Sequence, residues 1–554
     1  MKLQDLNYKK LFWNIIGIKA IIYYKNKGCC MKHIKSLYMK GFKKFDEITV
    51  KFNENTNILV GENEAGKSTV LEAIKIVLNQ MYKNTDKSIL KDLFNKTQIE
   101  NFLANPSIET LPKIEIELDL ALEPTEKNTE YFYGENNRNE NADFGIKFTC
   151  IFNEEIGISL IDVINKGEIP YEYYNLSWAT YAKQQYYLIK RPLNFISIDT
   201  SENDTNSSFN YFNKALFYSR YSEEERIASK NKFRNKLNEM FASIDLADID
   251  EHRKFGINDK KVILESVLSV YEDSIALENK GSGMSNLIKT KIALDKPNNN
   301  LDVVLIEEPE NHLCHTTLLK MLSEIEKWQS DSQIIITTHN NLITSRLNLR
   351  NVIWITNNEA KSLKDISKDD ADFFMKADNN NFLQILLSKK VILVEGATEF
   401  LLLPRIYQQI TGRTIENDEI NIISCNGISY LRYLNVVNDA NKKMVVLTDN
   451  DNKDIKIEES TNYNNEHINQ HIFLDSNKDN WTWEKCFYVL NKETLEGLIE
   501  INPNAIYLFH EKDYGKVLGK MLNNKVDTAY IMLNSGIDFV IPQYIQDAIK
   551  WLNE

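Results

Sequence analysis

The sequence predicts an α/β protein with two domains, and three observations carry this prediction. A glycine-rich loop at residues 61–68 lies between a predicted strand and a predicted helix. Two apolar strands, at 301–307 and 333–337, lead directly into acidic residues or a histidine. After residue 389, short apolar runs alternate with helical stretches. We therefore expect a mixed sheet with a phosphate-binding loop and a helical subdomain, followed by a parallel sheet flanked by helices.

Length and composition limit the class of protein. The chain has 554 residues, more than one domain usually holds, and its 43% hydrophobic and 26% charged residues are typical of a globular protein. Its 66 basic and 79 acidic residues give a net charge of −13, which argues against coating nucleic acid through the overall field but leaves a local basic groove open. The six cysteines form no C-x-x-C pair, so we expect neither a zinc module nor a disulfide framework, and a cytoplasmic location fits best.

The first thirty residues form a separate N-terminal segment. Their apolar stretch, residues 11–24, contains Asn14 and Lys19 and is shorter than the roughly 20 residues that a spanning helix needs. No A-x-A cleavage motif follows it. We expect no membrane partner, and we interpret residues 1–30 as a dispensable extension, with the fold beginning near Met31.

The first domain is expected over residues 31–380. Apolar alternation or short apolar runs predict strands, and helical spacing predicts one helix after the glycine loop; the strands are 33–42, 47–52, 55–63, 113–122 and 145–152, and the helix is 68–80. A helical, dimerising insert is expected at about 200–280. In it we predict a charged amphipathic helix over 222–241 and a second helix over 262–277. The second domain, residues 381–554, is expected to end in a helical part.

The glycine loop has the sequence of a phosphate-binding loop. Gly61 and Gly66 begin and end the G-x-x-x-x-G segment of G-x-x-x-x-G-K-[ST]. Backbone N–H groups turn around the phosphates at the N-terminus of the helix, Lys67 supplies a charge to the β and γ oxygens, and Ser68 ligates Mg²⁺. We add the neighbouring polar residues to the same nucleotide-binding set: Asn63 and Thr69.

Two strand ends supply further groups for nucleotide chemistry. The strand at 301–307 ends in Glu307 and Glu308, as a Walker B strand does. Glu307 is expected in the Mg²⁺ shell, and Glu308 is expected to orient or deprotonate the attacking water. The strand at 333–337 leads to His339, which at that offset can face the γ-phosphate. Taken alone, the first motif has the alternative of a buried strand followed by an acidic turn. Taken alone, His339 has the alternative of a structural histidine.

Between these motifs, a Lys-Gly-Ser-Gly-Met-Ser segment opens a predicted helix. Ser282 and Gly283 stand in its first turn, where backbone N–H groups form an anion site. The motifs, in this order over residues 31 to about 350, resemble the ABC-type ATPase family in its SMC and RecF branch. This resemblance implies an ATP-dependent homodimer or higher homo-oligomer, assembled through the ATPase domain, in which residues 281–285 complete the ATP site of a partner subunit. The segment departs from L-S-G-G-Q, and the insert lacks a long heptad run, so we expect a compact head.

A second group of carboxylates follows the strands of the second domain. Glu395 ends one predicted strand and Glu399 lies on the following helix, while Asp449 and Asp451 follow a later strand. The carboxyl ends of parallel strands meet at one crevice. Carboxylates gathered there repel one another unless a divalent cation neutralises them, so we expect a Mg²⁺ or Mn²⁺ site. Surface turns are the alternative for each motif alone.

These motifs together resemble the Toprim domain of topoisomerases, primases and nucleases. An ABC-type ATPase followed by a Toprim domain resembles the OLD (overcoming lysogenisation defect) family of ATPase-nucleases, over residues 31–554. The resemblance implies that Glu395 is a metal ligand or acid–base residue, that Glu484 joins the metal ligands, and that a late lysine stabilises the developing charge. Lys525 is the best match for this lysine; the nearby competitors are Lys516 and Lys520.

The resemblance implies a metal-dependent DNA endonuclease that binds and hydrolyses ATP, with two metals about 3.5–4 Å apart clamping the phosphodiester. Defence against phage or other foreign DNA, alongside a companion protein or nucleic acid, fits such a family. Two alternatives remain open. A RecF-like DNA clamp would have a structural C-terminal domain, and a topoisomerase or primase would need a tyrosine or zinc module, for which no cysteine cluster exists.

Overall fold

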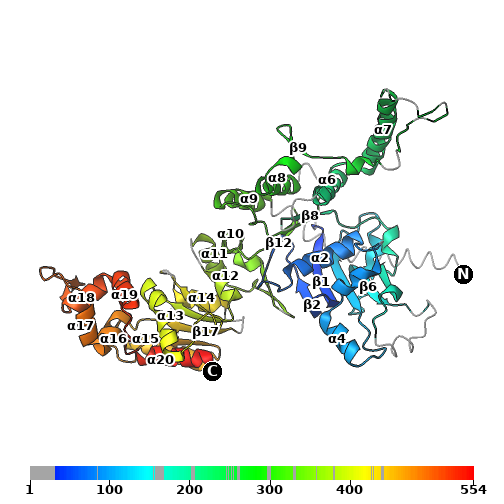
Figure 1. The fold of residues 1–554 in the computed structure, drawn as a ribbon. Helices are drawn as coiled ribbons and strands as arrows, with labels where there is room; N and C mark the ends of the chain where they lie inside the picture. Colours follow the sequence, from blue (N-terminus) through cyan, green and yellow to red (C-terminus); the bar gives the residue numbers. More distant parts are fainter. Residues whose placement is uncertain are drawn as a thin grey trace. The chain divides into compact units, whose positions relative to one another are not determined.

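The computed structural model describes most of the chain from Met31 to Glu554. It describes residues 31–554 except 84, 154, 156–167, 201–205, 245, 247–248, 251, 254, 259–261, 296–300, 329–331, 357, 378–380, 426, 428 and 438–441. The extension predicted at residues 1–30 lies outside the described residues. The chain divides into two compact units between Lys364 and Asp365, whereas the sequence analysis placed the domain boundary near residue 380. Figure 1 shows the elements of both units.

The first unit contains an antiparallel sheet. Its strand order is β2-β1-β4-β6-β5, with β7 also paired to β6. The bounds are β1 His33–Phe42, β2 Phe45–Lys51, β4 Ile114–Ala121, β5 Tyr133–Gly134, β6 Asp143–Phe152 and β7 Tyr174–Thr180. Alternating apolar residues face the core from β4, which shows why this segment pairs as a half-buried strand.

A second sheet in the same unit carries the motif strands. Its order is β14-β13-β3-β12-β11-β8, and all neighbours are parallel except β14. The bounds are β3 Thr56–Val60, β8 Phe195–Asp199, β11 Val303–Glu307, β12 Gln333–Thr337, β13 Val352–Ile355 and β14 Ala360–Ser362. β3, β11 and β12 are buried over their whole length. The sequence analysis missed β8.

Helix α2, Lys67–Asn79, packs into the core that the two sheets share. Eight of its residues are buried. Apolar side chains of β1, β4, β6, β11 and α2 belong to one cluster. Burying each large apolar side chain contributes about 1.5–3 kcal/mol. The position of the phosphate-binding loop is therefore fixed by the core directly behind it.

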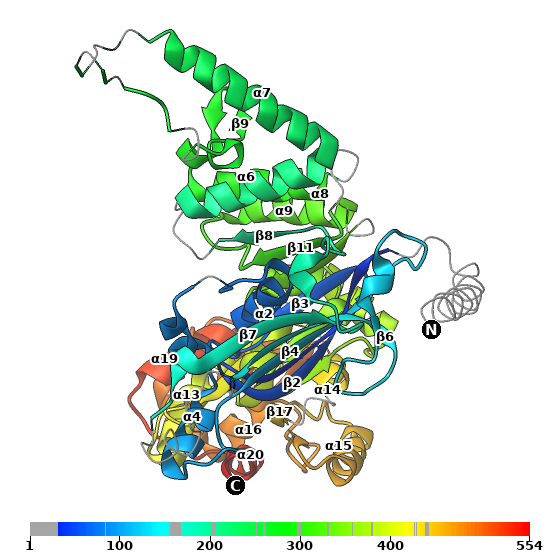
Figure 2. The same ribbon diagram turned by 90° about the vertical axis from the view of Figure 1, so that its right-hand side faces the viewer.

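The helical subdomain of the first unit extends from the second sheet. It comprises α6 Asn206–Arg220, α7 Glu223–Ala242, α8 Ser282–Leu294 and α9 His315–Trp328. Figure 2 shows α6 beside β8 and α7 running away from the sheets. The prediction that the 222–241 helix is amphipathic is wrong: none of the residues of α7 is buried, because charges occur all round it. Its start follows the sequence closely, since Ser222 and Glu225 form a capping box.

The helix predicted over residues 262–277 is also wrong. This segment contains a short hairpin of β9, Tyr271–Glu272, and β10, Ile275–Ala276. Asp273 and Ser274 both have positive φ, 52° and 65°, which a two-residue type I′ turn requires. Local turn chemistry outweighed the apolar spacing on which the prediction depended.

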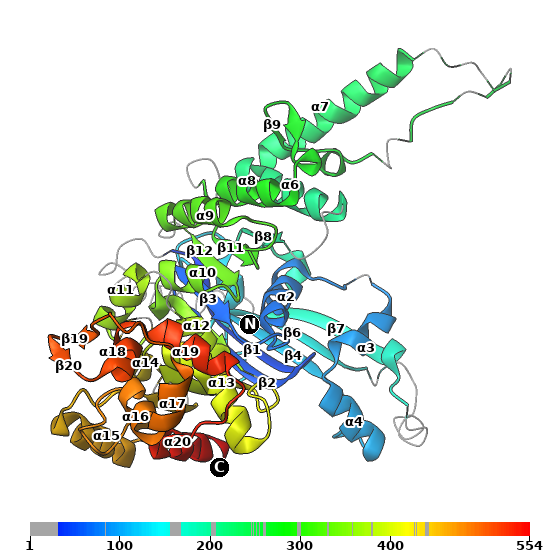
Figure 3. The same cartoon turned by 60° about the vertical axis from the view of Figure 1, so that its left-hand side comes forward.

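The second unit is built on the parallel sheet β16-β15-β17-β18. The strands are β15 Lys390–Val394, β16 Ile420–Ser424, β17 Lys443–Leu447 and β18 Gln470–Phe473. Its helices are α11 Lys368–Lys376, α12 Phe382–Leu387, α13 Ala397–Thr411, α14 Tyr430–Val437, α15 Asp454–Glu466, α16 Trp483–Leu490, α17 Lys492–Leu498, α18 Lys516–Asn523, α19 Lys525–Asn534 and α20 Gln543–Asn553. Figure 3 shows α13, α18 and α19 side by side.

The predicted fold class is confirmed in both units. The first combines a mixed sheet, a phosphate-binding loop and a helical subdomain, and the second is a parallel sheet flanked by helices with a helical C-terminal part. Among the described residues, no helix combines the length and apolar character that crossing a membrane requires.

Candidate functional site

The phosphate-binding loop joins β3 to α2. Gly66, the N-cap of α2, has φ +99°, and a Cβ at this position would overlap the ring of Phe45. Lys67 donates hydrogen bonds from Nζ to the carbonyls of Gly61 (2.9 Å) and Glu62 (3.1 Å). Burial lowers the pKa of Lys67, and the carboxylates of the Walker B loop oppose this shift. The lysine is thus held at the loop, where a phosphate can replace the carbonyls as its partner.

The other loop residues named from the sequence differ in exposure. Asn63 and Ser68 are exposed and Thr69 is half-buried. The hydroxyl of Ser68 contacts Glu307 at the end of β11, and this bond opposes the rise in the pKa of that carboxyl. The pair proposed to bind the nucleotide's Mg²⁺, Ser68 and Glu307, is therefore brought together.

Glu307 and Glu308 occupy different environments. Glu307 is 5% exposed, and its pKa is raised by burial, with Asp199 and Glu308 adding to the shift. Glu308 has φ 45° and donates its backbone N–H to the carbonyl of Thr337 (2.9 Å). Glu308 thus lies just beyond the end of β11, in a left-handed backbone conformation, whereas Glu307 is the last residue of the strand.

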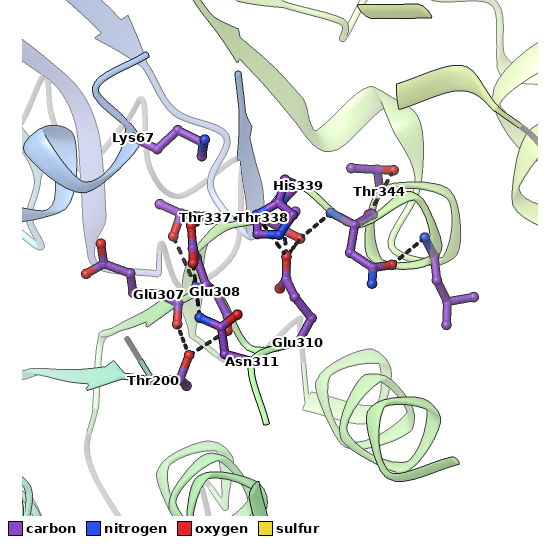
Figure 4. Close-up of polar contacts among 12 residues, drawn as sticks. Lys67, Thr200, Glu307, Glu308, Glu310, Asn311, Thr337, Thr338, His339 and Thr344 are labelled. Carbon is purple, nitrogen blue, oxygen red and sulfur yellow. Dashed lines mark hydrogen bonds and ion pairs between the residues drawn. The ribbon is translucent and has the colours of Figure 1, made fainter. Parts of the chain in front are cut away.

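His339 lies beside this second carboxylate. Its Nδ1 is 3.7 Å from Oε1 of Glu308 and 3.7 Å from Oε1 of Glu310. The backbone N–H of His339 donates to Oε1 of Glu310 (3.0 Å), which also accepts from the Thr338 hydroxyl (2.6 Å). Figure 4 shows the histidine, the acidic loop and Lys67 in one region. The hydrogen bond from the backbone of His339 to Glu310 therefore positions the imidazole next to Glu308.

Several residues of this centre were missed by the sequence analysis. The hydroxyl of Thr200 donates to the carbonyls of Glu307 (2.8 Å) and Glu308 (2.5 Å), and Asn311 Nδ2 donates to Oε2 of Glu308 (3.0 Å). Asp199 ends β8 opposite the end of β11. The apolar run of β8 followed by Asp-Thr was the available signal, because it repeats the pattern of a buried strand that ends in a polar group.

The segment containing Ser282 and Gly283 forms the first turn of α8. A Cβ on Gly283 would overlap the backbone carbonyl of His312, so α8 begins against the loop that follows β11. Gly281, the N-cap of α8, has open space around it. In the described part of this chain, no hydrogen bond joins Ser282 to the phosphate-binding loop. Its role toward a nucleotide remains a prediction.

In the second unit, Glu395 and Glu399 lie at the junction of β15 and α13. Glu395 follows β15, and its Oε1 accepts a hydrogen bond from the Thr448 hydroxyl at the end of β17. Glu399 is in the first turn of α13, which begins after Gly396. Burial raises the pKa of Glu399 to about 7, and the charges of Glu484 and Glu395 add to this shift. The two strand ends therefore meet as predicted.

Asp449, Glu484 and Lys525 complete this cluster. Oδ1 of Asp449 accepts the backbone N–H of Trp483 (2.9 Å), at the start of α16. The pKa of Asp449 is raised well above its usual range, first by burial and then by Glu399, Glu395 and Glu484. Lys525 Nζ is 3.0 Å from Oε2 of Glu484, which is 2% exposed. The lysine offsets part of the negative charge.

The remaining named residues lie apart from this cluster or at its edge. Asp451 is exposed, and its carboxylate is 2.8 Å from Nζ of Lys456. Lys516 and Lys520 donate to the carbonyls of Pro503 and Glu500, at 2.8 and 2.6 Å. Of the three candidate lysines, the structure joins Lys525 to the carboxylates.

The donor chemistry of this cluster fits a divalent cation. Four carboxylates lie within electrostatic reach of one another, and burial makes the charges of Glu399 and Asp449 costly without a cation. Oxygen donors suit Mg²⁺ or Mn²⁺. Among the residues that the structure describes, no three acidic, histidine or cysteine side chains already stand close enough to share one ion.

Two sequence families match the two units. The family described as "AAA ATPase domain" matches residues 31–197 and 153–344. The family described as "Overcoming lysogenization defect protein-like, TOPRIM domain" matches residues 386–451. The residues matched by the first family include β11 and β12, the two strands that lead to Glu307 and His339. The residues matched by the second family include Glu395, Glu399, Asp449 and Asp451.

Curated relatives match over shorter stretches. The Old nuclease of Escherichia phage P2 is 27% identical over 177 residues, which cover 30% of each chain. The DNA replication and repair protein RecF of Halalkalibacterium halodurans is 48% identical over 42 residues, 8% of this chain and 11% of the relative. RecF of Clostridium acetobutylicum is 39% identical over 61 residues, 11% of this chain and 17% of the relative. The matches thus span less than a third of these relatives' length.

Solved structures were also compared. The SMC head domain from Thermotoga maritima is 14% identical, with a TM-score of 0.27, and covers 60% of this chain and 98% of its own. The recombination mediator RecF bound to ATP is 11% identical, with a TM-score of 0.30, and covers 61% and 99%. The family assignment depends on the sequence matches instead: over residues 31–344 this chain belongs to the AAA ATPase domain family, and it carries in addition an OLD-like Toprim domain.

Proposed function

We propose that this protein is an ATP-binding and ATP-hydrolysing, divalent-metal-dependent DNA endonuclease that nicks or cuts by phosphodiester hydrolysis. The carboxylate centre of the second unit carries the proposal. Glu395, Glu399, Asp449 and Glu484 come from the ends of two strands and the first turns of two helices, and Lys525 pairs with one of them. A surface turn does not gather two buried acids, Glu399 and Glu484, and two half-buried ones, Glu395 and Asp449.

Each residue of this centre has a proposed task. A divalent cation, when bound, would polarise the phosphodiester and supply a nucleophilic water, with Mg²⁺ or Mn²⁺ as the suitable ions. Glu395, Asp449, Glu399 and Glu484 would hold it, with Asp451 at the edge. Lys525 would stabilise the negative charge that develops on the phosphate oxygens. Thr448 and the N–H of Trp483 fix two of the carboxylates in orientation.

The nucleotide centre is proposed to bind ATP with Mg²⁺. Gly61, Asn63, Gly66 and Thr69 would surround the phosphates, Lys67 would contact the β and γ oxygens, and Ser68 with Glu307 would hold the cation. Glu308 would orient the attacking water, and His339 would face the γ-phosphate. Ser282 and Gly283 would complete the site of a partner copy in a homodimer.

The biological setting is proposed on the family matches. An OLD-like Toprim domain and the partial match to a phage Old nuclease support action on DNA. Defence against phage or foreign DNA, in the cytoplasm, alone or with a companion protein or nucleic acid, is the setting we infer.

Plasmid cleavage tests the nuclease directly. Supercoiled plasmid is incubated with purified protein and Mg²⁺ or Mn²⁺, with and without ATP, and nicked and linear forms are measured. We expect Glu395→Gln to abolish cleavage and Glu458→Gln, an exposed acid of α15, to retain it. Lys525→Met should lower the rate by at least tenfold, since removing one electrostatic stabiliser costs about 10²–10³ in comparable sites. The same plasmid products from Glu395→Gln and wild type would refute the proposal.

A RecF-like DNA clamp without nuclease activity is the second candidate. The short matches to RecF proteins favour it. It predicts ATP-dependent DNA binding that Lys67→Ala removes, together with intact plasmid under every metal condition. The clustering of four carboxylates, two of them with a raised pKa, favours the nuclease.

A further inference from the structure

A cavity of ≈ 1260 Å³ lies in the first unit, apart from the phosphate-binding loop. It is bounded by the C-terminal end of α2, the segment 187–195 that leads into β8, and the junction of α6 with α7. Figure 2 labels four of the elements next to this cavity: α2, β8, α6 and α7. Neither the proposed ATPase chemistry nor the proposed nuclease chemistry uses most of its lining.

The lining of this cavity is basic although the chain is acidic. Six cations line it against three carboxylates; the cations are Lys75, Lys190, Arg191, Lys214, Arg220 and Arg226, and the acids are Asp199, Glu223 and Glu225. Over the whole chain the acids exceed the bases by 79 to 66. The reversal of charge is therefore local to the cavity.

In the part of the chain that the structure describes, these cations lack an acidic partner. Among the described residues, no carboxylate lies within ion-pair distance of any of the six, and Arg226 donates to the backbone carbonyls of Tyr218 and Tyr221. Lys190, Arg191, Lys214 and Arg220 are also exposed. Unpaired like charges gathered in one cavity repel one another, and an anion with several charges relieves this repulsion. The cavity thus has the electrostatics of a polyanion site.

Tyrosines alternate with these cations. Tyr187 and Tyr221 are 50% and 47% exposed at the cavity. Tyr211 and Tyr218 are held from behind, since Asn79 donates to the Tyr211 hydroxyl (3.0 Å) and the Arg226 guanidinium covers the Tyr218 ring at 4.5 Å. Exposed rings between cations are the features on which successive bases of an unpaired strand stack while the phosphates are neutralised.

We propose that this cavity is a binding groove for a single strand of nucleic acid. Its volume exceeds the range of about 300–1,000 Å³ for small-molecule sites, and its cations are spread over α2, the 187–195 segment and α6 instead of converging on one phosphate. Both features favour a strand over a free nucleotide. The inference depends on the proposed function only in taking nucleic acid as the substrate.

Fluorescence anisotropy of labelled 20-nucleotide oligo(dT) and oligo(U) tests the groove, in EDTA and without nucleotide. The charge variant is Lys190→Ala with Arg191→Ala and Lys214→Ala, and the ring variant is Tyr187→Ala with Tyr221→Ala. We expect the charge variant to weaken binding at least tenfold and to reduce the salt slope by about 2, at about 0.7 per lost phosphate contact. The ring variant should weaken binding about tenfold with an unchanged slope.

A matched control replaces three exposed lysines outside the groove, Lys127, Lys232 and Lys236, by alanine, and we expect wild-type binding. Weaker binding in both groove variants supports the inference. The oligonucleotide that binds more tightly, oligo(dT) or oligo(U), shows whether the groove prefers DNA or RNA. Wild-type affinity in both groove variants would overturn the inference. The inference would also be overturned if the ring variant lost as much affinity for a duplex as for a single strand. It would be overturned as well if the protein bound free nucleoside triphosphates but neither oligonucleotide.

The groove and the nuclease fail separately in this design. Glu395→Gln protein that binds oligonucleotide through the groove, while wild type leaves plasmid intact, refutes the nuclease and keeps the groove. Conversely, both groove variants could cleave plasmid as wild type does and bind oligonucleotide with unchanged affinity. That result refutes the groove and keeps the nuclease.

Discussion

Glu399 offers a quantitative test of the carboxylate centre, because its pKa lies near neutrality. Burial raises that pKa to about 7, with the charges of Glu484 and Glu395 adding to the shift. A carboxyl with this pKa is about half protonated at pH 7. A divalent cation that binds the centre must then displace about 0.5 proton from Glu399, about 0.9 at pH 6 and about 0.1 at pH 8.

The change to test is Glu399→Gln, which keeps the shape of the side chain and removes its titration. Asp449 enlarges the expected difference in proton release between wild type and variant. The charge of Glu399 helps to raise the pKa of Asp449, and the substitution removes that charge, so Asp449 holds less proton in the variant. We therefore expect wild type to release at least about 0.4 proton more than the variant per cation at pH 7. The difference should be larger at pH 6 and small at pH 8.

Calorimetric titration of nucleotide-free protein with Mg²⁺ measures this release. Repeating the titration in two buffers of different ionisation enthalpy gives the number of protons displaced. Glu307→Gln is the matched control, since it removes the carboxyl of raised pKa from the nucleotide centre. It should leave the Glu399 contribution in place. Equal proton release from wild type and Glu399→Gln at pH 6 would show that the reasoning is wrong.

Three further predictions concern glycines and a cysteine. Gly283→Ala should reduce ATPase activity at least tenfold, because its Cβ would displace α8 from the loop after β11, whereas Gly497→Ala, in α17 and with open space around it, should retain activity. Gly66→Ala should lose binding of a fluorescent ATP analogue through overlap with an aromatic ring, while Gly412→Ala, with φ +71° but open space, should lose only about 1 kcal/mol of stability. Hydrogen bonds from two neighbouring threonines lower the pKa of exposed Cys314 to about 7. With the two N-terminal cysteines replaced by serine, iodoacetamide labelling should rise to half its maximum near pH 7; a midpoint near pH 9 would contradict this.

Parts of both centres were predictable from the sequence because their signals are local. A buried apolar strand that ends in a carboxylate, or is followed by one within two residues, describes Glu307 of the nucleotide centre and Glu395 and Asp449 of the carboxylate centre, and the structure places each of them at the end of its strand. The phosphate-binding loop carries its own spacing as well. In these places the chemistry and the fold are specified by the same few residues.

Other features could not be predicted from local patterns. β8 was missed because its five residues follow an irregular segment, and its identity as a strand comes from pairing with β11, more than a hundred residues later in the chain. The hairpin at 271–276 depends on two residues with positive φ, which apolar spacing does not encode. The basic cavity gathers cations from α2, α6 and the 187–195 segment, so only the folded chain brings them together.

Strand β8, which the sequence analysis missed, ends at a residue that lies both at the groove and at the nucleotide centre. Asp199, at the end of β8, and Lys75, in α2, both line the cavity. Both also act on the charge of Glu307, Asp199 by raising its pKa and Lys75 by lowering it. If the groove binds a nucleic-acid strand as proposed, phosphates that attract Lys75 would change the field at Glu307, the residue proposed to hold the nucleotide's cation. Coupling between two binding sites is reciprocal, so ATP with its cation must affect the affinity of the strand by the same factor. If both proposed sites are occupied, we therefore expect nucleic acid and nucleotide to affect each other's binding within the first unit.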